Sequence, residues 1–227
     1  MRTTTFVLAV MLLVAGAAAG QGYEEYQNNA DGFKVDIPGT PVITKTTFRS
    51  EHGYALPANV YTSTRGRAQY TITVVDFRPI EALGKQRANE CVEKTQICQG
   101  NTNTGPGFWL HDVRGALVYA SHMFMKRNAK LTDYVWAQHD RIEGHELQLT
   151  NPDESRTYAY IAMHEMKLYI TEATVPKGEA PATRFQTSMS FVDKDGKPVR
   201  YDGYYSNTYH GLGVYPPPRR VTPAPAQ

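Results

Sequence analysis

Seven histidines are the residues in this sequence best suited to hold a metal ion or move a proton, but their spacing points to neither role. They are His52, His111, His122, His139, His145, His164 and His210. A helical zinc site places two histidines four residues apart, as in His-Glu-x-x-His, and that motif does not occur. His139 and His145 flank a predicted turn and could meet His164 across strands. We expect histidines at the surface or in hydrogen bonds, with no metal ion and no cofactor.

Serines and acidic residues could supply a nucleophile or an acid–base pair, yet neither forms a recognisable motif. The serines lie outside Gly-x-Ser-x-Gly and Ser-x-x-Lys, so a serine hydrolase is not indicated. Scattered acids such as Asp140, Glu143 and Glu146 would need a set separation in a cleft to cleave a glycoside. We therefore predict no catalytic residue. The alternative is an exported hydrolase whose site is assembled from residues distant in the sequence.

Cys91 and Cys98 are the two cysteines of the chain, and in an exported protein such a pair is more often bonded than free. On one continuous helix, positions seven apart lie about 10 Å from each other, which is too far for a disulfide. A bond therefore requires the helix to end between them, and the loop-forming residues from Gly100 onward permit this. We predict a Cys91–Cys98 disulfide, and the alternative is two unpaired thiols.

Tyrosine is abundant, with 15 copies, and five of them lie in or beside one Gly-rich segment near the C-terminus. These are Tyr201, Tyr204, Tyr205, Tyr209 and Tyr215. Tyrosines spaced in this way can stack on sugar rings or dock on a partner protein. Contact with a cell-envelope protein or polysaccharide is therefore one hypothesis for these residues. The favoured interpretation is that they pack the segment onto the edge of the domain.

The N-terminus has the pattern of a secretion signal. Arg2 is followed by an unbroken apolar run over residues 6–14 and by small residues over 15–20. The apolar run is well short of the roughly 20 residues that span a bilayer as a helix. We predict a signal peptide over residues 1–20, cleaved after Ala19, and a periplasmic or secreted mature chain without stable membrane insertion.

The charge of the mature chain is close to balanced. Without Arg2 it carries 23 lysines and arginines against 22 aspartates and glutamates. Binding to nucleic acid requires clustered excess positive charge on the protein surface. Nucleic acid is therefore not an expected partner.

Strands with alternating apolar and polar residues make up most of the chain. They are expected over residues 33–37, 42–48, 56–61, 70–74, 116–126, 134–141, 146–150, 157–164, 167–175 and 199–201. Helical spacing replaces the alternation over residues 80–95 and 185–192. Short turns join neighbouring strands, which favours antiparallel pairs.

These elements predict an α+β fold, with a mostly antiparallel sheet flanked by two main helices. We expect a single domain over residues 32–203. A polar, loosely ordered segment over residues 21–31 precedes it. A tail over residues 204–227, rich in Tyr and Gly and then in Pro, follows it and is expected to be extended from Tyr215 onward.

Four stretches of sequence resemble a group of exported alphaproteobacterial proteins of unknown function. They cover residues 31–41, 54–58, 169–176 and 185–191. The layout also resembles the PsbP-like fold, named for the extrinsic P subunit of photosystem II. That resemblance implies an antiparallel sheet with flanking helices and an accessory or binding role, and no functional residue transfers from it. We therefore expect an exported accessory or binding protein of the periplasm or cell envelope, without evident catalytic activity.

Overall fold

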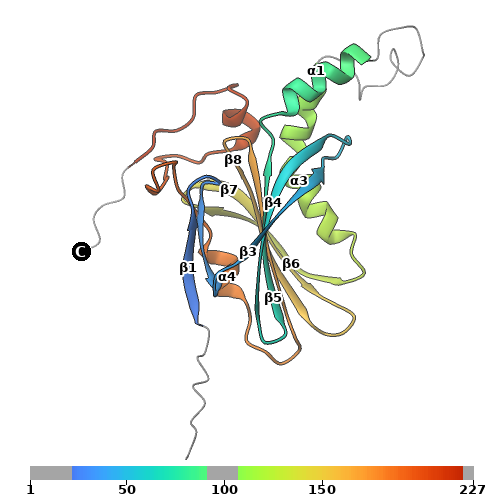
Figure 1. The fold of residues 1–227 in the computed structure, drawn as a ribbon, viewed down its shortest axis with the longest axis vertical. Helices are drawn as coiled ribbons and strands as arrows, with labels where there is room; N and C mark the ends of the chain where they lie inside the picture. The colour runs from blue at the N-terminus through green and yellow to red at the C-terminus, as the bar shows by residue number, and fades with distance from the viewer. Residues whose placement is uncertain (1–21, 91–106, 222–227) are drawn as a thin grey trace, which may run out of the picture.

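The computed structural model describes residues 22–90 and 107–221, which form an α+β unit of two antiparallel sheets with helices against them (Figure 1). The small sheet has the order β1-β2-β10, and the large sheet has the order β3-β4-β5-β9-β8-β7-β6. The strands are β1 (Tyr23–Asn28), β2 (Phe33–Pro38), β3 (Val42–Arg49), β4 (Ala55–Arg65), β5 (Ala68–Asp76), β6 (Lys130–His139), β7 (Ile142–Thr150), β8 (Arg156–His164), β9 (Lys167–Val175) and β10 (Ser190–Phe191). The helices are α1 (Ile80–Glu90), α3 (Trp109–Met125) and α4 (Thr183–Ser188), with a π-helical turn, η2 (Asn207–Gly211). The predicted fold class is confirmed.

The large sheet consists of two runs of consecutive antiparallel strands that join at its centre. The first run is β3-β4-β5 and the second is β6-β7-β8-β9, and β5 pairs with β9. Two-residue turns in the left-handed region connect β6 to β7 and β8 to β9. Asp140 and Arg141 have φ angles of 52° and 65°, and Glu165 and Met166 have φ angles of 47° and 63°. Such turns match the twist of the strands that they connect.

The small sheet corrects the expectation that residues 21–31 are loosely ordered. β1 pairs with β2 from Tyr23 opposite Pro38 to Asn28 opposite Phe33. Tyr26 packs its ring 6.1 Å from that of Phe33, and Tyr23 packs against Tyr70 of the large sheet at 5.9 Å. The segment is polar because most of its side chains face solvent, but its two tyrosines fix it to the core.

Residues 116–126 form the second half of helix α3, so the predicted strand there is wrong. The residues that α3 buries include Val113, Ala116, Ala120 and Phe124, which are spaced three and four apart. Val118 and Met123, by contrast, are exposed. Exposed apolar residues between the small buried ones imitated the alternation of a strand.

Three other elements differ in extent from the prediction. The helix expected over residues 185–192 is the single turn α4, followed at once by β10. The strand expected over residues 199–201 is reduced to an isolated bridge between Tyr201 and Arg220. The helix expected over residues 80–95 is present as α1 up to Glu90, and the structure describes no residue from 91 to 106.

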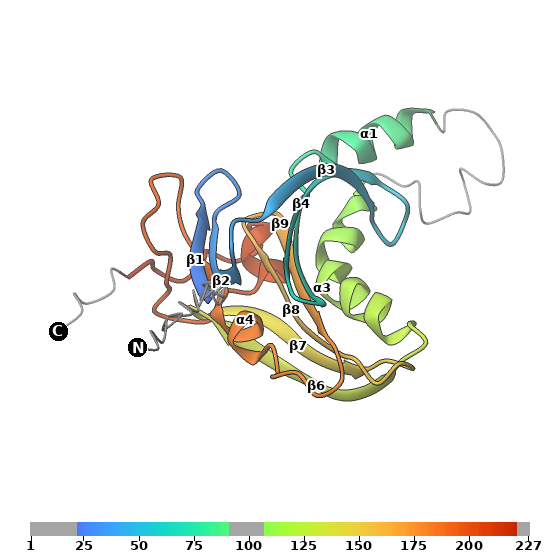
Figure 2. The same ribbon diagram turned by 60° about the horizontal axis from the view of Figure 1, so that its bottom comes forward.

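The two faces of the large sheet carry different cores. The tyrosine face, covered by the small sheet and α4, includes the buried residues Tyr61, Tyr70, Tyr158, Tyr160, Tyr169, Tyr201 and Tyr205. The α3 face, covered by α3, is built largely from aliphatic residues, with Tyr54 as its one fully buried tyrosine among the described residues. Figure 2 shows α3 on one side of the curved sheet and the pair β1 and β2 with α4 on the other.

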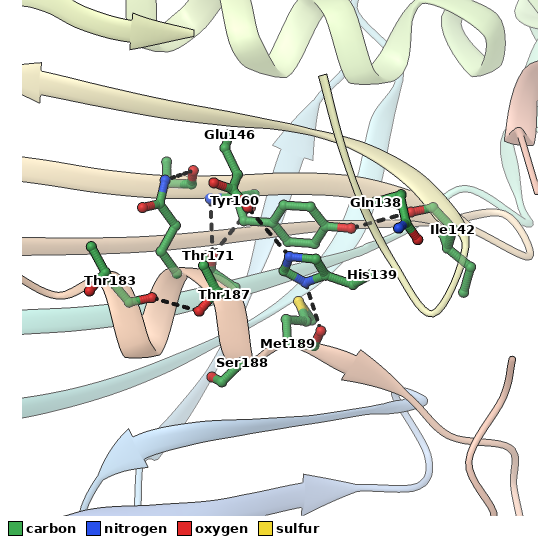
Figure 3. A network of polar contacts seen from close by, with 12 residues as sticks. Gln138, His139, Ile142, Glu146, Tyr160, Thr171, Thr183, Thr187, Ser188 and Met189 are labelled. Atoms are coloured by element: carbon green, nitrogen blue, oxygen red, sulfur yellow. Dashed lines mark hydrogen bonds and ion pairs between the residues drawn. The ribbon is translucent and has the colours of Figure 1, made fainter. Parts of the chain in front are cut away.

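A polar network ties the β6–β7 corner to α4 and β10 on the tyrosine face (Figure 3). The His139 ring stacks on the Tyr160 ring, with centroids 3.8 Å apart. Its Nδ1 donates to the carbonyl of Met189 at 2.8 Å, and its Nε2 lies 3.5 Å from the Glu146 carboxylate. The ring and both ring nitrogens of His139 therefore have partners within the domain, and His139 has a structural role.

Candidate functional site

A pocket of about 490 Å³ opens at the end of the sheets where the β1–β2 turn, the β8–β9 turn and the segment after β10 meet. The pocket is lined by more basic than acidic side chains. The basic ones are Arg78, Lys167, Lys194 and Arg220, and the acidic ones are Glu165 and Asp193. We therefore take this pocket as the candidate functional site.

The β1–β2 turn forms one wall of the pocket and depends on a glycine. Gly32 has a φ of 78°, and a side chain at this position would meet the Tyr169 hydroxyl and the Val192 carbonyl at 3.3 Å. The Asn28 side chain fixes the turn by accepting a hydrogen bond from the Asp31 backbone N–H at 2.9 Å. Glycine thus lets the turn close tightly over β9 and over the residues after β10.

Asp31 is the polar centre beside this wall. Its Oδ2 accepts hydrogen bonds from the Tyr61 hydroxyl and from the Asn59 amide, and its Oδ1 lies 3.6 Å from the Lys167 Nζ. Lys167 also donates to the Ala30 carbonyl at 2.6 Å. Burial raises the pKa of Tyr61, and the adjacent Asp31 carboxylate raises it further. Tyr61 therefore stays protonated and acts as a donor.

A second hollow of about 300 Å³ shares Arg78 and Lys167 with the pocket. Arg78 donates to both carboxylate oxygens of Asp76, at 2.8 and 2.6 Å. Burial alone would raise the pKa of Asp76, but the hydrogen bonds from Arg78 outweigh burial and lower it. Arg78 and Lys167 are thus held in place by carboxylates, and they form a charged ridge between the two hollows.

His164 lies at the inner end of the pocket and is almost fully buried. Burial, helped by the positive charges of Arg220 and Lys167, lowers the pKa of His164 to about 3. The imidazole is therefore neutral at neutral pH, and its Nε2 shares a hydrogen bond of 2.8 Å with the Tyr201 hydroxyl. Its burial and this bond make it a structural part of the pocket.

Arg220 reaches the pocket from the C-terminal segment, which folds back along the domain. The Val221 N–H donates to the Arg200 carbonyl at 2.8 Å, and the Asp202 N–H donates to the Arg219 carbonyl at 2.9 Å. The Arg220 guanidinium pairs with the Glu165 carboxylate. The predicted extended tail is therefore packed on the domain as far as residue 221.

The five predicted contact tyrosines separate into two groups. Tyr201 and Tyr205 are buried in the tyrosine face and stack on each other with centroids 5.1 Å apart. Tyr204, Tyr209 and Tyr215 are exposed, at 60%, 51% and 58%. The boundary predicted at residue 203 lies within a packed region, because Tyr205 is part of the core and η2 contacts α3. Only the exposed group can touch a partner.

His139, His145 and His164 do not meet. His145 lies on the α3 face, where its Nδ1 is 2.8 Å from the Ser121 hydroxyl and 3.0 Å from that of Tyr134. Ser121 is 1% exposed, so this serine–histidine pair is closed to a substrate. Within residues 22–90 and 107–221 no group of histidine, cysteine or acidic side chains could hold a metal ion.

A histidine–aspartate pair lies between the β3–β4 hairpin and α3. The His52 Nδ1 is 2.8 Å from the Asp112 Oδ2, and the His52 backbone N–H donates to the Asp112 Oδ1 at 3.0 Å. The Asp112 side chain is completely buried. Among the described residues no hydroxyl group hydrogen-bonds to the other ring nitrogen, so the pair anchors the β3–β4 hairpin to α3.

Two predictions fall outside the described residues. Cys91 and Cys98 lie between residues 91 and 106, and the signal peptide lies within residues 1–21. In the part of the chain that the structure describes, no helix has the length and apolar character needed to cross a membrane.

Sequence reasoning did not identify the charged residues of the pocket and the second hollow. Asp31, Arg78, Lys167 and Arg220 come from four separate segments, and each is an unremarkable charged residue in its own segment. The two-residue turn at Glu165 was the only local indication, since it places the end of β8 and the start of β9 side by side.

Comparisons with known proteins show a structural likeness and no likeness in sequence. No family model matches the chain, and no curated protein matches it. The chain is similar to the solution structure of cyanobacterial PsbP (CyanoP) from Synechocystis sp. PCC 6803. The identity is 12%, the match covers 78% of this chain and 96% of the other, and the TM-score is 0.42.

Proposed function

We propose that this chain is an exported accessory protein of the cell envelope that binds a ligand through an anionic group. The observation that carries the proposal is the pocket of about 490 Å³ with four basic and two acidic lining residues. Carboxylates and phosphates are the anionic groups that arginine and lysine bind best.

The charges in the pocket leave room for such a ligand. Lys194 is 90% exposed at its side chain and lies 3.8 Å from Asp195, a weak surface pair. Arg220 pairs with Glu165, whose side chain is 56% exposed. A surface ion pair of this kind contributes little, so an anionic ligand can replace Glu165 as the partner of Arg220.

The same residues favour binding over reaction. The Tyr169 hydroxyl donates to the Asp31 backbone carbonyl at 2.8 Å, and burial raises its pKa. His164 is neutral and its Nε2 is already bonded to Tyr201. A hydrolase needs a free nucleophile next to a base, and no such pair lines the pocket. The exported hydrolase remains the alternative.

Export is supported by the sequence pattern of residues 1–20, which ends in small residues before the first described strand. Membership of the exported alphaproteobacterial group remains a prediction. N-terminal sequencing of the chain recovered from the periplasm or medium tests cleavage after Ala19. An N-terminus at Met1 would contradict it.

Calorimetric titration with an acidic oligosaccharide, a neutral oligosaccharide, inorganic phosphate and a dicarboxylate tests the binding proposal. We expect at least one anionic probe to bind and the neutral one not to bind. Substituting Arg220→Ala should lower the affinity about 10- to 100-fold, because a charge-assisted hydrogen bond contributes about 1.5–3 kcal/mol.

Lys85→Ala is the matched control for this experiment. Lys85 is an exposed cation on α1 with a surface ion pair to Glu81, and it lies away from the pocket. It should leave the affinity unchanged. Equal losses in Lys85→Ala and Arg220→Ala would show that binding follows overall charge and would reject the pocket as the site.

A further inference from the structure

Strand β6 ends the large sheet and leaves one backbone edge open. Its inner edge pairs with β7 over the whole strand, from Lys130 opposite Thr150 to His139 opposite Ile142. Within the described part of the chain no strand pairs with the outer edge. Figure 2 shows β6 along the lower rim of the sheet. A row of unpaired N–H and C=O groups is a ready template for another strand.

The middle of β6 is apolar and exposed on both faces. Tyr134, Val135 and Trp136 are 41%, 43% and 52% exposed. Tyr134 and Trp136 lie opposite Leu147 and His145 of β7, so they share the α3 face, while Val135 points to the other face. This three-residue segment has the composition of the centre of an interface, where aromatic side chains are enriched.

The opposite edge of the same sheet is protected and β6 is not. Proteins guard an edge strand with proline and charged residues, above all lysine. β3 follows Pro41 and carries Lys45 and Arg49 along its length. In β6 the charged residues Lys130 and Asp133 lie near its start, and a bulge lies between Leu131 and Asp133. Residues 134–137 carry neither charge nor proline.

We propose that β6 pairs with β6 of a second copy of this chain, forming an antiparallel dimer with its two-fold axis at Val135. A two-fold axis perpendicular to the sheet keeps each face on the same side, so one residue must lie opposite its own copy. With Val135 at the axis, Tyr134 lies opposite the partner's Trp136 and Trp136 lies opposite the partner's Tyr134. Asp133 then lies opposite the partner's Ala137, so no like charges face each other.

This register extends an aromatic contact that each copy already has. The Trp136 ring lies 5.5 Å from that of Tyr204 in an edge-on arrangement. Pairing places the Tyr134 ring of one copy beside the Trp136 ring of the other, and cross-strand aromatic pairs stabilise antiparallel strands. Tyr204, one of the predicted contact residues, thereby flanks the interface.

Charge substitutions at Val135 test the proposal. The experiment uses the full-length chain, purified in the form that the producing cell releases. Val135→Lys and Val135→Glu each place two like charges opposite each other at the axis, which destabilises the pairing. We expect sedimentation to show a wild-type dimer and to show that each variant dissociates with a constant raised at least about tenfold. An equimolar mixture of the two variants should recover the dimer, because lysine then faces glutamate.

Two further measurements make the outcome decisive. Val42→Lys on the exposed edge strand β3 is the control, and it should leave the dimer intact. In a Trp109→Phe background, the fluorescence of Trp136 should shift to shorter wavelength as the concentration rises. A wild-type chain that is monomeric throughout, or a variant mixture that fails to recover the dimer, overturns the proposal and leaves the edge to a strand from a different protein.

Discussion

The two faces of the large sheet solve the same packing problem with different side chains. The tyrosine face fills its core with rings that carry hydroxyl groups, among them Tyr61, Tyr169 and Tyr201. The α3 face relies on small and aliphatic residues under one long helix, such as Ala116, Ala120 and Leu147. Both cores are buried, so the difference lies in the polar atoms that each core presents at its edge.

This difference explains where the pocket is found. A tyrosine ring buries like a phenylalanine ring and still brings a donor to the boundary of the core. Tyr61 and Tyr169 donate to Asp31, the first to its side chain and the second to its backbone. The Tyr201 hydroxyl shares a hydrogen bond with His164. The tyrosine face can thus hold charged groups at its edge, which the aliphatic core of the α3 face is less suited to do.

The largest expected loss of stability comes from removing one large aromatic ring from the core on each face. Phe185 of α4 is completely buried on the tyrosine face, and Phe124 of α3 is 3% exposed on the other. Phe185→Ala and Phe124→Ala should each reduce the free energy of unfolding by about 3–5 kcal/mol, measured by urea denaturation. A loss below about 1 kcal/mol on either face would show that its helix is only a loose cover.

The next largest effect is on the pH dependence of stability, which should differ between histidines on the two faces. His164 has a pKa of about 3 in the folded chain, whereas an unfolded histidine titrates near 6.5. Below pH 6.5 the unfolded state takes up a proton that the folded state refuses, so stability falls as the pH is lowered. From pH 7 to pH 5 this group alone should remove about 2 kcal/mol.

His164→Gln should remove that part of the pH dependence, measured as the change in unfolding free energy between pH 7 and pH 5. His145, whose pKa is also lowered by burial, is the counterpart on the α3 face. Because His164 is the more deeply buried of the two, His145→Gln should flatten the profile less. An identical response from both variants would remove this distinction between the faces.

The smallest effect deletes one hydroxyl group from each face. Tyr61→Phe removes a donor to the Asp31 carboxylate and should cost about 1–2 kcal/mol, because bonds to charged groups are stronger than neutral ones. Ser121→Ala should change stability by less than about 0.5 kcal/mol, since alanine favours the helix and His145 keeps its contact with Tyr134. Thermal unfolding of both variants measures the contrast. The reverse order would place the important polar contact under α3.

Much of the large sheet could be predicted from sequence because strands with one face in each core alternate regularly. Strand β9 agrees with its prediction at both ends, and β8 begins one residue earlier than predicted. The strand prediction over residues 116–126 failed because the positions of the larger apolar residues did not match the positions that are buried. In α3 the buried positions are partly small, as at Ala116 and Ala120. The strand prediction therefore rested on Leu117, Tyr119, Met123 and Met125, none of which is buried.

The candidate site could not be predicted for a different reason. Lys167 and Asp31 are far apart in the sequence and meet only because β1 and β2 lie across the end of β9. Arg220 is positioned by backbone hydrogen bonds between residues 219–221 and residues 200–202. No pattern in the sequence predicts these hydrogen bonds. Only the exposed members of the predicted tyrosine group, such as Tyr204, were placed by sequence where a partner could reach them.

The pairing of β5 with β9 determines the order in which this chain can assemble. Thr73 lies opposite Ile170, about one hundred residues later, whereas every other neighbouring pair in the large sheet is a local hairpin. The two halves can therefore form early, but the apolar edges of β5 and β9 stay open until both are present. A chain whose synthesis stops before Val175, or that is cut before it, would expose those edges and aggregate. Correct folding of this protein therefore depends on synthesis of the whole of β9.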